Sequence, residues 1–274
     1  MSTPKSLFSL DNKIAVITGG TGVLGQSMVK GLSAAGASVA ILGRRKEAAE
    51  DLVKEIKASG GKALAVKADV LDRHQLEEAR TEIIREFGSI DILVNAAGGN
   101  MPGAIIAPDK NFFDLNLADF QKVVDLNLMG TVMPTQVFSE DMAKRKKGVI
   151  INIASMATFR PITRVVGYSA AKAAVGNFTE WLAVEMAKKF GEGIRVNAIS
   201  PGFFLTEQNR ALLSNPDGTY TARGQSAINQ TPFARFGKPE ELIGTLVWLC
   251  SDASAFVTGV NVPVDGGFNV FCGV

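Results

Sequence analysis

The stretch "KIAVITGGTGVLGQSMVKGL", residues 13–32, decides the fold class of this 274-residue chain. An apolar run at 14–17 leads directly into glycines at positions 19, 20, 22 and 25, and a segment of helical period follows at 23–35. Glycines between a strand and a helix let the backbone approach a phosphate group, which the helix N-terminus then stabilises. Residues 20–25, "GTGVLG", fit the G-x-G-x-x-G pattern of dinucleotide-binding loops.

The alternation of apolar runs with helical stretches continues along the whole chain. Continuous apolar strands separated by helices predict a parallel sheet that is covered on both faces. No long linker or composition shift divides residues 1–274, so we expect one α/β domain, a Rossmann-type doubly wound parallel sheet with helices on both faces. Further strands are expected at 38–42, 62–69, 90–97, 148–155, 194–200 and 259–267, and further helices at 45–59, 73–87 and 168–189.

The composition excludes several classes of function. The net charge is only +2, which gives no electrostatic reason to bind nucleic acid or an anionic membrane. His74 is the single histidine, and Cys250 and Cys272 lack metal-ligand spacing, so we expect no metal site and no Ser-His-Asp hydrolase. The first 13 residues lack a signal-peptide core and no run is long enough to span a membrane, which predicts a cytoplasmic protein.

Two irregular segments, 99–116 and 206–240, interrupt the alternation and are rich in Gly, Pro, Asn and Asp. Both follow the carboxyl ends of predicted strands, where ligands bind in sheets of this kind. Long excursions in a compact domain are usually functional. We therefore expect a substrate lid at about 206–238, and for the first segment a lid and a surface loop are equally compatible with the sequence.

The end of the second predicted strand indicates the cofactor. NAD-binding folds place an Asp or Glu there to bind the ribose 2′-hydroxyl, whereas this chain has Gly43 followed by Arg44 and Arg45. A missing carboxylate removes repulsion of a 2′-phosphate, and a guanidinium can bind that phosphate in a bidentate fashion. NADP(H) is thus favoured over NAD(H), which stays possible. The alternative is that both arginines simply begin an exposed helix.

Ser155, Tyr168 and Lys172 form a constellation suited to proton transfer. Tyr168 and Lys172 are four residues apart on a predicted helix and share one face, while Ser155 ends a buried strand. A free tyrosine has a pKa of about 10 and is a poor acid or base at neutral pH. A nearby ammonium lowers that pKa, and a serine hydroxyl can bind the same substrate oxygen. Together the three predict chemistry at a carbonyl oxygen.

With these motifs the chain resembles the short-chain dehydrogenase/reductase family from about residue 10 to its end. "NAAG" (95–98) is similar to the family's N-N-A-G with Ala96 replacing the second Asn, "PGFFLT" (201–206) matches P-G-x-x-x-T, and "VPVDGG" (262–267) matches the last strand. The glycine loop departs from the family's T-G-x-x-x-G-x-G, because Val23 stands at the sixth place and the glycine comes one residue earlier.

The resemblance implies a role for each residue of the site. Tyr168 exchanges a proton with the substrate oxygen while hydride moves to or from the nicotinamide, and Lys172 lowers the pKa of Tyr168 and binds the nicotinamide ribose. Ser155 polarises the carbonyl, and Asn127, in "VVDLNLMGT", holds a water of the proton relay. The cofactor-binding set is Gly19, Thr21, Gly22, Val23, Leu24, Gly25, Arg44, Arg45, Asp69, Val70, Asn95, Ala97, Gly98, Tyr168, Lys172, Pro201, Gly202, Phe204 and Thr206.

The resemblance also suggests a substrate and an assembly. The lid and the ending "DGGFNVFCGV" resemble the D-mannonate oxidoreductase (D-fructuronate reductase) branch, whose sugar-acid substrate needs a carboxylate partner such as a bidentate arginine. Family members commonly form tetramers or dimers, which implies a homo-oligomer through helices around 116–143 and 170–189. Arg164, Gln208 and Arg223 are further candidates near the substrate, and the expected set is Asn100, Ser155, Arg160, Asn209 and Arg210.

Other functions remain compatible with the sequence. These arginines can equally serve subunit contacts or solvent. The same chemistry can act on another polyol, ketose or keto-acyl substrate, although enzymes of that last kind usually have a more apolar lid. A catalytically idle nucleotide-binding regulator is a third possibility, but such proteins typically lose the Tyr or the Lys, and this chain keeps both Tyr168 and Lys172.

Overall fold

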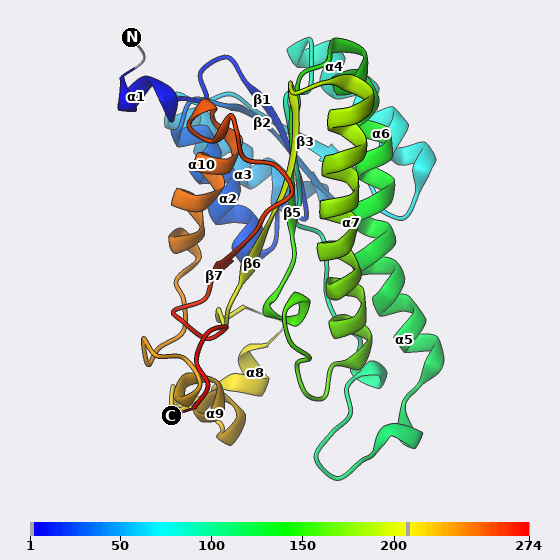
Figure 1. Cartoon of the computed structure of the whole chain (residues 1–274), viewed down its shortest axis with the longest axis vertical. Helices are drawn as coiled ribbons and strands as arrows, with labels where there is room; N and C mark the ends of the chain where they lie inside the picture. The colour runs from blue at the N-terminus through cyan, green and yellow to red at the C-terminus, as the bar shows by residue number, and fades with distance from the viewer. Residues whose placement is uncertain (1–2, 207–208, 274) are drawn as a thin grey trace.

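The computed structural model describes residues 3–206 and 209–273 and contains a seven-stranded, wholly parallel sheet (Figure 1). The strand order is β3-β2-β1-β4-β5-β6-β7. The first three strands build the sheet outward from β1 to β3, and the chain then crosses back to place β4 on the other side of β1, from where β5, β6 and β7 extend to the opposite edge. This architecture confirms the predicted fold class. The strands are β1 (Ile14–Thr18), β2 (Ser38–Gly43), β3 (Ala63–Lys67), β4 (Ile92–Asn95), β5 (Gly148–Ile153), β6 (Ile194–Pro201) and β7 (Asn261–Val264).

Helices cover both faces of the sheet, as Figure 1 shows with α2, α3 and α10 on one side and α4, α6 and α7 on the other. The α-helices are α1 (Pro4–Leu7), α2 (Val23–Ala34), α3 (Lys46–Ala58), α4 (Arg73–Phe87), α5 (Leu117–Val124), α6 (Gly130–Arg145), α7 (Val166–Phe190), α8 (Arg210–Leu213), α9 (Ala222–Asn229) and α10 (Ile243–Cys250). A π-helical turn, η3 (Asp125–Met129), joins α5 to α6. Short 3₁₀ turns are η1 (Pro102–Ala104), η2 (Phe112–Asp114), η4 (Met156–Thr158), η5 (Pro239–Leu242) and η6 (Asp252–Ser254).

Each face of the sheet carries its own hydrophobic core. Met28 and Leu32 of α2 pack with Leu246 of α10 on one face, and Leu76 of α4 packs with Phe138 of α6 on the other. All five side chains are at most 1% exposed. Burying one such side chain stabilises the fold by roughly 1.5–3 kcal/mol. Because the central strands are buried from both sides, they read as continuous apolar runs rather than alternating ones.

A buried polar ladder fixes α6 and α7 against the middle of the sheet. The Asn95 amide of β4 donates to Thr135 Oγ1 of α6 at 2.8 Å and to Asn152 Oδ1 of β5 at 2.9 Å. The Asn152 amide in turn donates to Thr179 Oγ1 of α7 at 2.9 Å. Hydrogen bonds in a dry interior are strong and directional, so this ladder sets the register of α7 on β5.

The structure corrects several details of the sequence prediction. The helix expected at 73–87 has the same bounds as α4, whereas the helix expected at 168–189 begins two residues earlier and ends one residue later. The lid segment expected at 206–238 is not simply irregular, since it contains the two short helices α8 and α9. Residues 207 and 208 of that segment lie outside the described residues.

Candidate active site

The loop after β1 has the geometry of a phosphate-binding turn. Gly19 adopts a left-handed φ of +65°, and a Cβ on Gly25 would lie only 2.2 Å from the Gly19 carbonyl oxygen. Gly22 donates its N–H to the same carbonyl at 3.0 Å and caps α2 without any side-chain hydrogen bond. No side chain among the described residues caps the first turn of this 12-residue helix, which leaves its backbone N–H groups for a ligand and fits the pyrophosphate of a dinucleotide.

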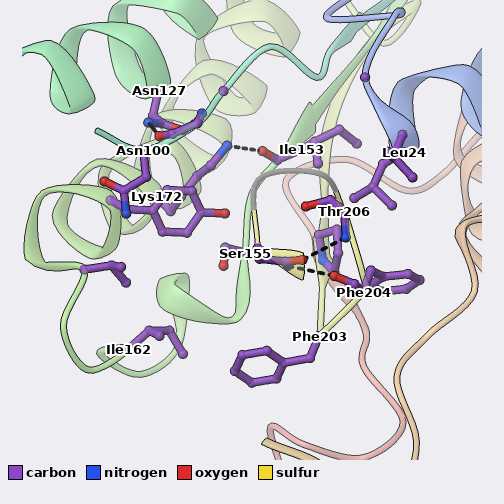
Figure 2. Close-up of a pocket in the computed structure, with 18 of the residues that line it drawn as sticks. Leu24, Asn100, Asn127, Ile153, Ser155, Ile162, Lys172, Phe203, Phe204 and Thr206 are labelled. Atoms are coloured by element: carbon purple, nitrogen blue, oxygen red, sulfur yellow. Dashed lines mark hydrogen bonds between the residues drawn. The ribbon is translucent and has the colours of Figure 1, made fainter. Parts of the chain in front are cut away.

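A cavity of about 400 Å³ extends from this loop across the carboxyl ends of the strands. Figure 2 shows Asn100, Asn127, Ser155 and Lys172 on one side of it and Leu24, Phe204 and Thr206 on the other. The glycine loop, the ends of β4, β5 and β6, the start of α7 and the two lid helices all contribute lining residues. This is the position where doubly wound sheets bind ligands.

The three residues expected to carry the chemistry all line this cavity. Ser155 lies two residues after β5 and caps η4, accepting from the Ala157 N–H at 3.2 Å, while Tyr168 lies in the first turn of α7. Lys172, one turn later, has its Nζ 5.8 Å from the centre of the Tyr168 ring. The i, i+4 spacing thus places phenol and ammonium on one face, as expected, next to the serine.

Burial controls the ionisation of both α7 groups. It lowers the pKa of Lys172 from 10.5 to about 8, because the ammonium is only 4% exposed and has lost most of its water. Lys172 Nζ donates to the Ile153 carbonyl at 2.6 Å. Burial likewise raises the pKa of the Tyr168 phenol above its usual value, and a hydrogen bond with Ser155 only partly opposes this. The expected lowering of the Tyr168 pKa by Lys172 therefore does not arise from the chain alone.

Asn127 lies in the π-helical turn and is fully buried. Its amide donates to the Gly99 carbonyl at 2.7 Å and to the Val123 carbonyl at 2.8 Å, and its Oδ1 accepts from the Gly99 N–H at 3.2 Å. A Cβ on Gly98 would lie 2.7 Å from Asn127 Oδ1 and 3.4 Å from Lys172 Nζ. Glycine at position 98 thus lets the asparagine and the lysine approach the same stretch of backbone.

The structure brings most of the expected cofactor residues to the cavity, but not all. Asn95 belongs to the polar ladder instead, and Asp69 Oδ1 accepts from the Leu71 N–H at 3.0 Å. Arg44 and Arg45 are both exposed, and only Arg45 lines the cavity. Lining residues from the expected set are Gly19, Gly22, Val23, Leu24, Gly25, Arg45, Gly98, Tyr168, Lys172, Pro201, Gly202, Phe204 and Thr206. Those outside the lining are Thr21, Arg44, Asp69, Val70, Asn95 and Ala97.

The expected substrate residues divide in the same way. Asn100 lines the cavity and accepts from the Met101 N–H at 2.9 Å, which leaves its amide nitrogen available to a ligand. Asn209 also lines it, but its side chain bonds the Thr206 N–H and the Phe204 carbonyl, both at 2.8 Å. Gln208 lies outside the described residues.

Two expected arginines do not line the cavity. Arg160 donates to the Asn269 carbonyl and stands over the Phe268 ring at 5.7 Å, so it braces the segment after β7 against the turn that follows Ser155. Arg210 is exposed on α8. Arg223 of α9 lines the cavity in their place. Arg223 is one of the further candidates from the sequence, and Arg164, another of them, does not line the cavity.

The charged side chains that line the cavity are all basic among the described residues. Arg45, Lys172 and Arg223 line the cavity, and no Asp or Glu does so in the part of the chain that the structure describes. Within residues 3–206 and 209–273, no group of three or more His, Cys, Asp or Glu side chains is placed to hold a metal ion. None of the helices described is both long and apolar enough to cross a membrane.

Comparison with known proteins identifies close relatives. The profile of the short chain dehydrogenase family matches residues 13–217. The uncharacterized oxidoreductase UxuB of Bacillus subtilis (strain 168) is 49% identical over 275 residues, covering 97% of this chain and 98% of the relative.

Solved structures agree with this relationship. A Haemophilus influenza protein, assigned provisionally as a D-mannonate oxidoreductase and crystallised with bound NAD, has a TM-score of 0.91 and 44% identity, covering 99% of this chain and 100% of that one. A gluconate 5-dehydrogenase from Burkholderia cenocepacia J2315, in complex with NADP and tartrate, has a TM-score of 0.87 and 32% identity, covering 97% and 98% of the two chains.

The buried lysine makes a prediction about stability and pH. Because burial lowers the pKa of Lys172 from 10.5 to about 8, the folded chain releases this proton at lower pH than the unfolded chain does. The contribution of Lys172 to the free energy of unfolding must therefore rise between pH 8 and 10.5. We expect the wild type to gain about 1–2 kcal/mol over Lys172→Met between pH 7.5 and 9.5, measured by urea denaturation. Lys189→Met, an exposed change on the same helix, is the control. A constant difference between wild type and Lys172→Met would contradict the prediction.

Proposed function

Since the chain belongs to the short-chain dehydrogenase family and is thus an NAD(P)-dependent oxidoreductase acting on CH–OH groups, we propose that its substrate is a sugar acid. The family membership confirms the resemblance drawn from the motifs. We propose the pair D-fructuronate and D-mannonate, interconverted by hydride transfer. The observation that carries this proposal is the charge of the cavity, where Arg45, Lys172 and Arg223 meet no acidic side chain among the described lining residues.

A cavity of this charge favours an anionic substrate. Two of the three cations have other uses, because Arg45 lies beside the glycine loop and Lys172 belongs to the catalytic helix. Arg223 comes from the lid, where a substrate rather than a cofactor is expected. The provisional assignment of the Haemophilus relative and the tartrate held by the Burkholderia relative, which is itself a hydroxy acid, agree with a carboxylate-bearing substrate.

The residues of α7 and β5 supply the proton chemistry in this proposal. The raised pKa keeps the Tyr168 phenol protonated at neutral pH, so it can donate to the substrate oxygen during reduction. Ser155 shares a hydrogen bond with Tyr168 and is placed to hold the same oxygen. The Lys172 ammonium beside the ring favours the phenolate that forms. The nicotinamide supplies or accepts the hydride.

Asn127 is proposed to support the return of the proton. Its Oδ1 and Lys172 Nζ both lie next to Gly98 at the cavity wall, where a water joining the lysine to solvent would need polar partners. The hydrogen bonds between Asn127 and Gly99 hold the asparagine in place. The proposed role is the one that the family resemblance implies for Asn127.

The proposed cofactor preference is NADP(H). Gly43 ends β2 without a carboxylate, and Arg45 lines the cavity beside the loop that is expected to hold the pyrophosphate. No ion pair with an acidic residue engages Arg44 or Arg45 in the described part of the chain, so a 2′-phosphate meets no competing carboxylate there. A relative with NAD bound is known, and the proposal concerns preference rather than exclusion.

We further propose that the chain acts as one domain with a lid at 206–238 and assembles as a homo-oligomer. Leu212, Leu213 and Arg223 bring both lid helices to the cavity wall. For assembly, the exposed face of α7 carries Trp181, which is 60% exposed, and Val184, which is 55% exposed. Apolar side chains this open to water are typical of a surface that a second subunit covers.

Replacing the proposed proton donor should abolish turnover but not cofactor binding. We expect Tyr168→Phe to lower kcat by at least 10³-fold, because the phenylalanine retains the ring and loses only the hydroxyl. NADPH affinity, measured by fluorescence titration, should change less than threefold. Tyr220→Phe is the matched control, since Tyr220 is the other tyrosine of the chain and does not line the cavity. Substantial turnover by Tyr168→Phe would remove Tyr168 from its assigned role.

The substrate class is tested by initial rates of NADPH oxidation. We expect kcat/KM for D-fructuronate to exceed that for D-fructose by at least 100-fold, because the two ketoses differ mainly at the terminal carboxylate and a buried charge-assisted pair is worth about 1.5–3 kcal/mol or more. Equal or better rates with D-fructose would refute the sugar-acid proposal and leave a reductase of neutral ketoses.

The cofactor preference is tested at Arg45. Arg45→Ala should raise KM for NADPH about tenfold or more and leave KM for NADH nearly unchanged, because only NADPH carries the 2′-phosphate. Arg44→Ala is the comparison, and its effect should be smaller because Arg44 does not line the cavity. A parallel rise in both KM values for Arg45→Ala would show that Arg45 does not read the 2′-phosphate.

A further inference from the structure

The two short lid helices, α8 and α9, contact each other closely and position one arginine, Arg223. Thr221 caps α9 by accepting from the Gly224 N–H at 3.1 Å, and its hydroxyl also donates to the Leu212 carbonyl of α8 at 2.6 Å. A Cβ on Gly224 would lie 1.9 Å from the Leu213 carbonyl oxygen, so α8 and α9 pack backbone to backbone. Arg223 projects from the first turn of this unit toward the cavity.

Arg223 reaches across to the loop that precedes the catalytic helix. Its guanidinium donates to the Thr163 carbonyl at 3.0 Å, with a longer contact of 3.4 Å to Thr163 Oγ1. Only part of its set of five N–H donors is used there, and the rest of the fork is open to a ligand. Thr163 stands three residues before α7, so the same contact links the lid to the loop leading to Tyr168.

A second arginine lies close to the first. Arg164 is held in a left-handed conformation, with φ of 71°, and its carbonyl accepts from the Ile106 N–H at 2.9 Å. Burial and, to a smaller extent, the charge of Arg164 lower the pKa of Arg223 from its usual value. Neither arginine forms an ion pair with an acidic side chain within residues 3–206 and 209–273.

Two neighbouring guanidinium groups without a counter-ion repel each other, and partial burial strengthens that repulsion. The cavity wall beside Arg223 is apolar, with Ile162 and Val165 from the loop and Leu212 from the lid. An anion that enters this region gains a charge-assisted contact with Arg223 and, at longer range, the attraction of the Arg164 charge. The two guanidinium groups thus lack a counter-ion among the described residues until an anion binds.

We propose that Arg223 binds the carboxylate of the substrate, assisted by the positive charge of Arg164, and so determines the specificity of the enzyme for sugar acids. This inference rests on the proposed function and names the anchor that selects the substrate. The lid arginine makes the direct bidentate contact, and Arg164 contributes charge from the loop before α7. The substrate carboxylate thereby joins the lid to the catalytic side of the cavity.

The test compares uncharged and charged substrates in purified variants. Arg223→Gln should lower kcat/KM for D-fructuronate at least 30-fold, mainly through KM, and leave kcat/KM for D-fructose within threefold of wild type. Arg164→Gln should lower the uronate value about fivefold, because it acts at longer range. Arg85→Gln, which removes an exposed charge on α4, should leave kcat/KM for both substrates unchanged. The competitive inhibition constant of tartrate should rise in Arg223→Gln as KM for the uronate does.

A conservative variant separates geometry from folding. Arg223→Lys keeps the charge but loses the bidentate fork, so the uronate value should fall between wild type and Arg223→Gln. If wild type prefers the uronate and Arg223→Gln keeps that preference, the anchor is refuted and the sugar-acid function stands. If wild type shows no preference for the uronate, the proposed function fails instead. Equal losses on both substrates in Arg223→Gln and Arg223→Lys would also overturn the anchor, because they indicate damage to the lid.

Discussion

The hydrogen bond from the Lys172 ammonium to the Ile153 carbonyl is the contact on which the site depends. It joins the first turns of α7 to the end of β5 at 2.6 Å, and the Asn152–Thr179 bond repeats the connection about two turns further along. With the helix held at two levels, Tyr168 has one position relative to Ser155. A helix packed only by apolar contacts could slide by a fraction of a turn, which would separate the phenol from the serine.

This contact has an electrostatic cost that shapes the rest of the cavity. A buried ammonium bonded to a neutral carbonyl lacks a counter-ion, which is why burial depresses its pKa to about 8. An acidic partner would restore the pKa but would also repel phosphate and carboxylate groups. The described lining contains no such partner, so the positive charge is left for the ligands. Arg45, expected at the cofactor, and Arg223, expected at the substrate, likewise line the cavity without an acidic partner among the described residues.

Local signals made much of the fold and site predictable, and long-range contacts account for the remainder. The turn from β1 into α2 and the spacing of Tyr168 and Lys172 are local patterns that sequence displays directly. The sequence does not predict the helix α10, because "IGTLVWLC" is a short, mostly apolar run, and such a run fits a buried strand as well as a helix. The sequence places Arg160 near the substrate because it follows Ser155, and it gives no sign of the contact with Asn269, which is 109 residues away.

The loop between η4 and α7 shows why substrate choice can change while catalysis does not. Arg160 at its start engages the segment after β7, Thr163 receives the lid arginine, and Arg164 binds the first irregular segment through Ile106. Three separate excursions therefore meet on the residues that lead into Tyr168. Lys172 is bonded to the end of β5 independently of these contacts. Variation in the excursions can thus reshape what the cavity binds, while the proton-transfer geometry stays with the sheet.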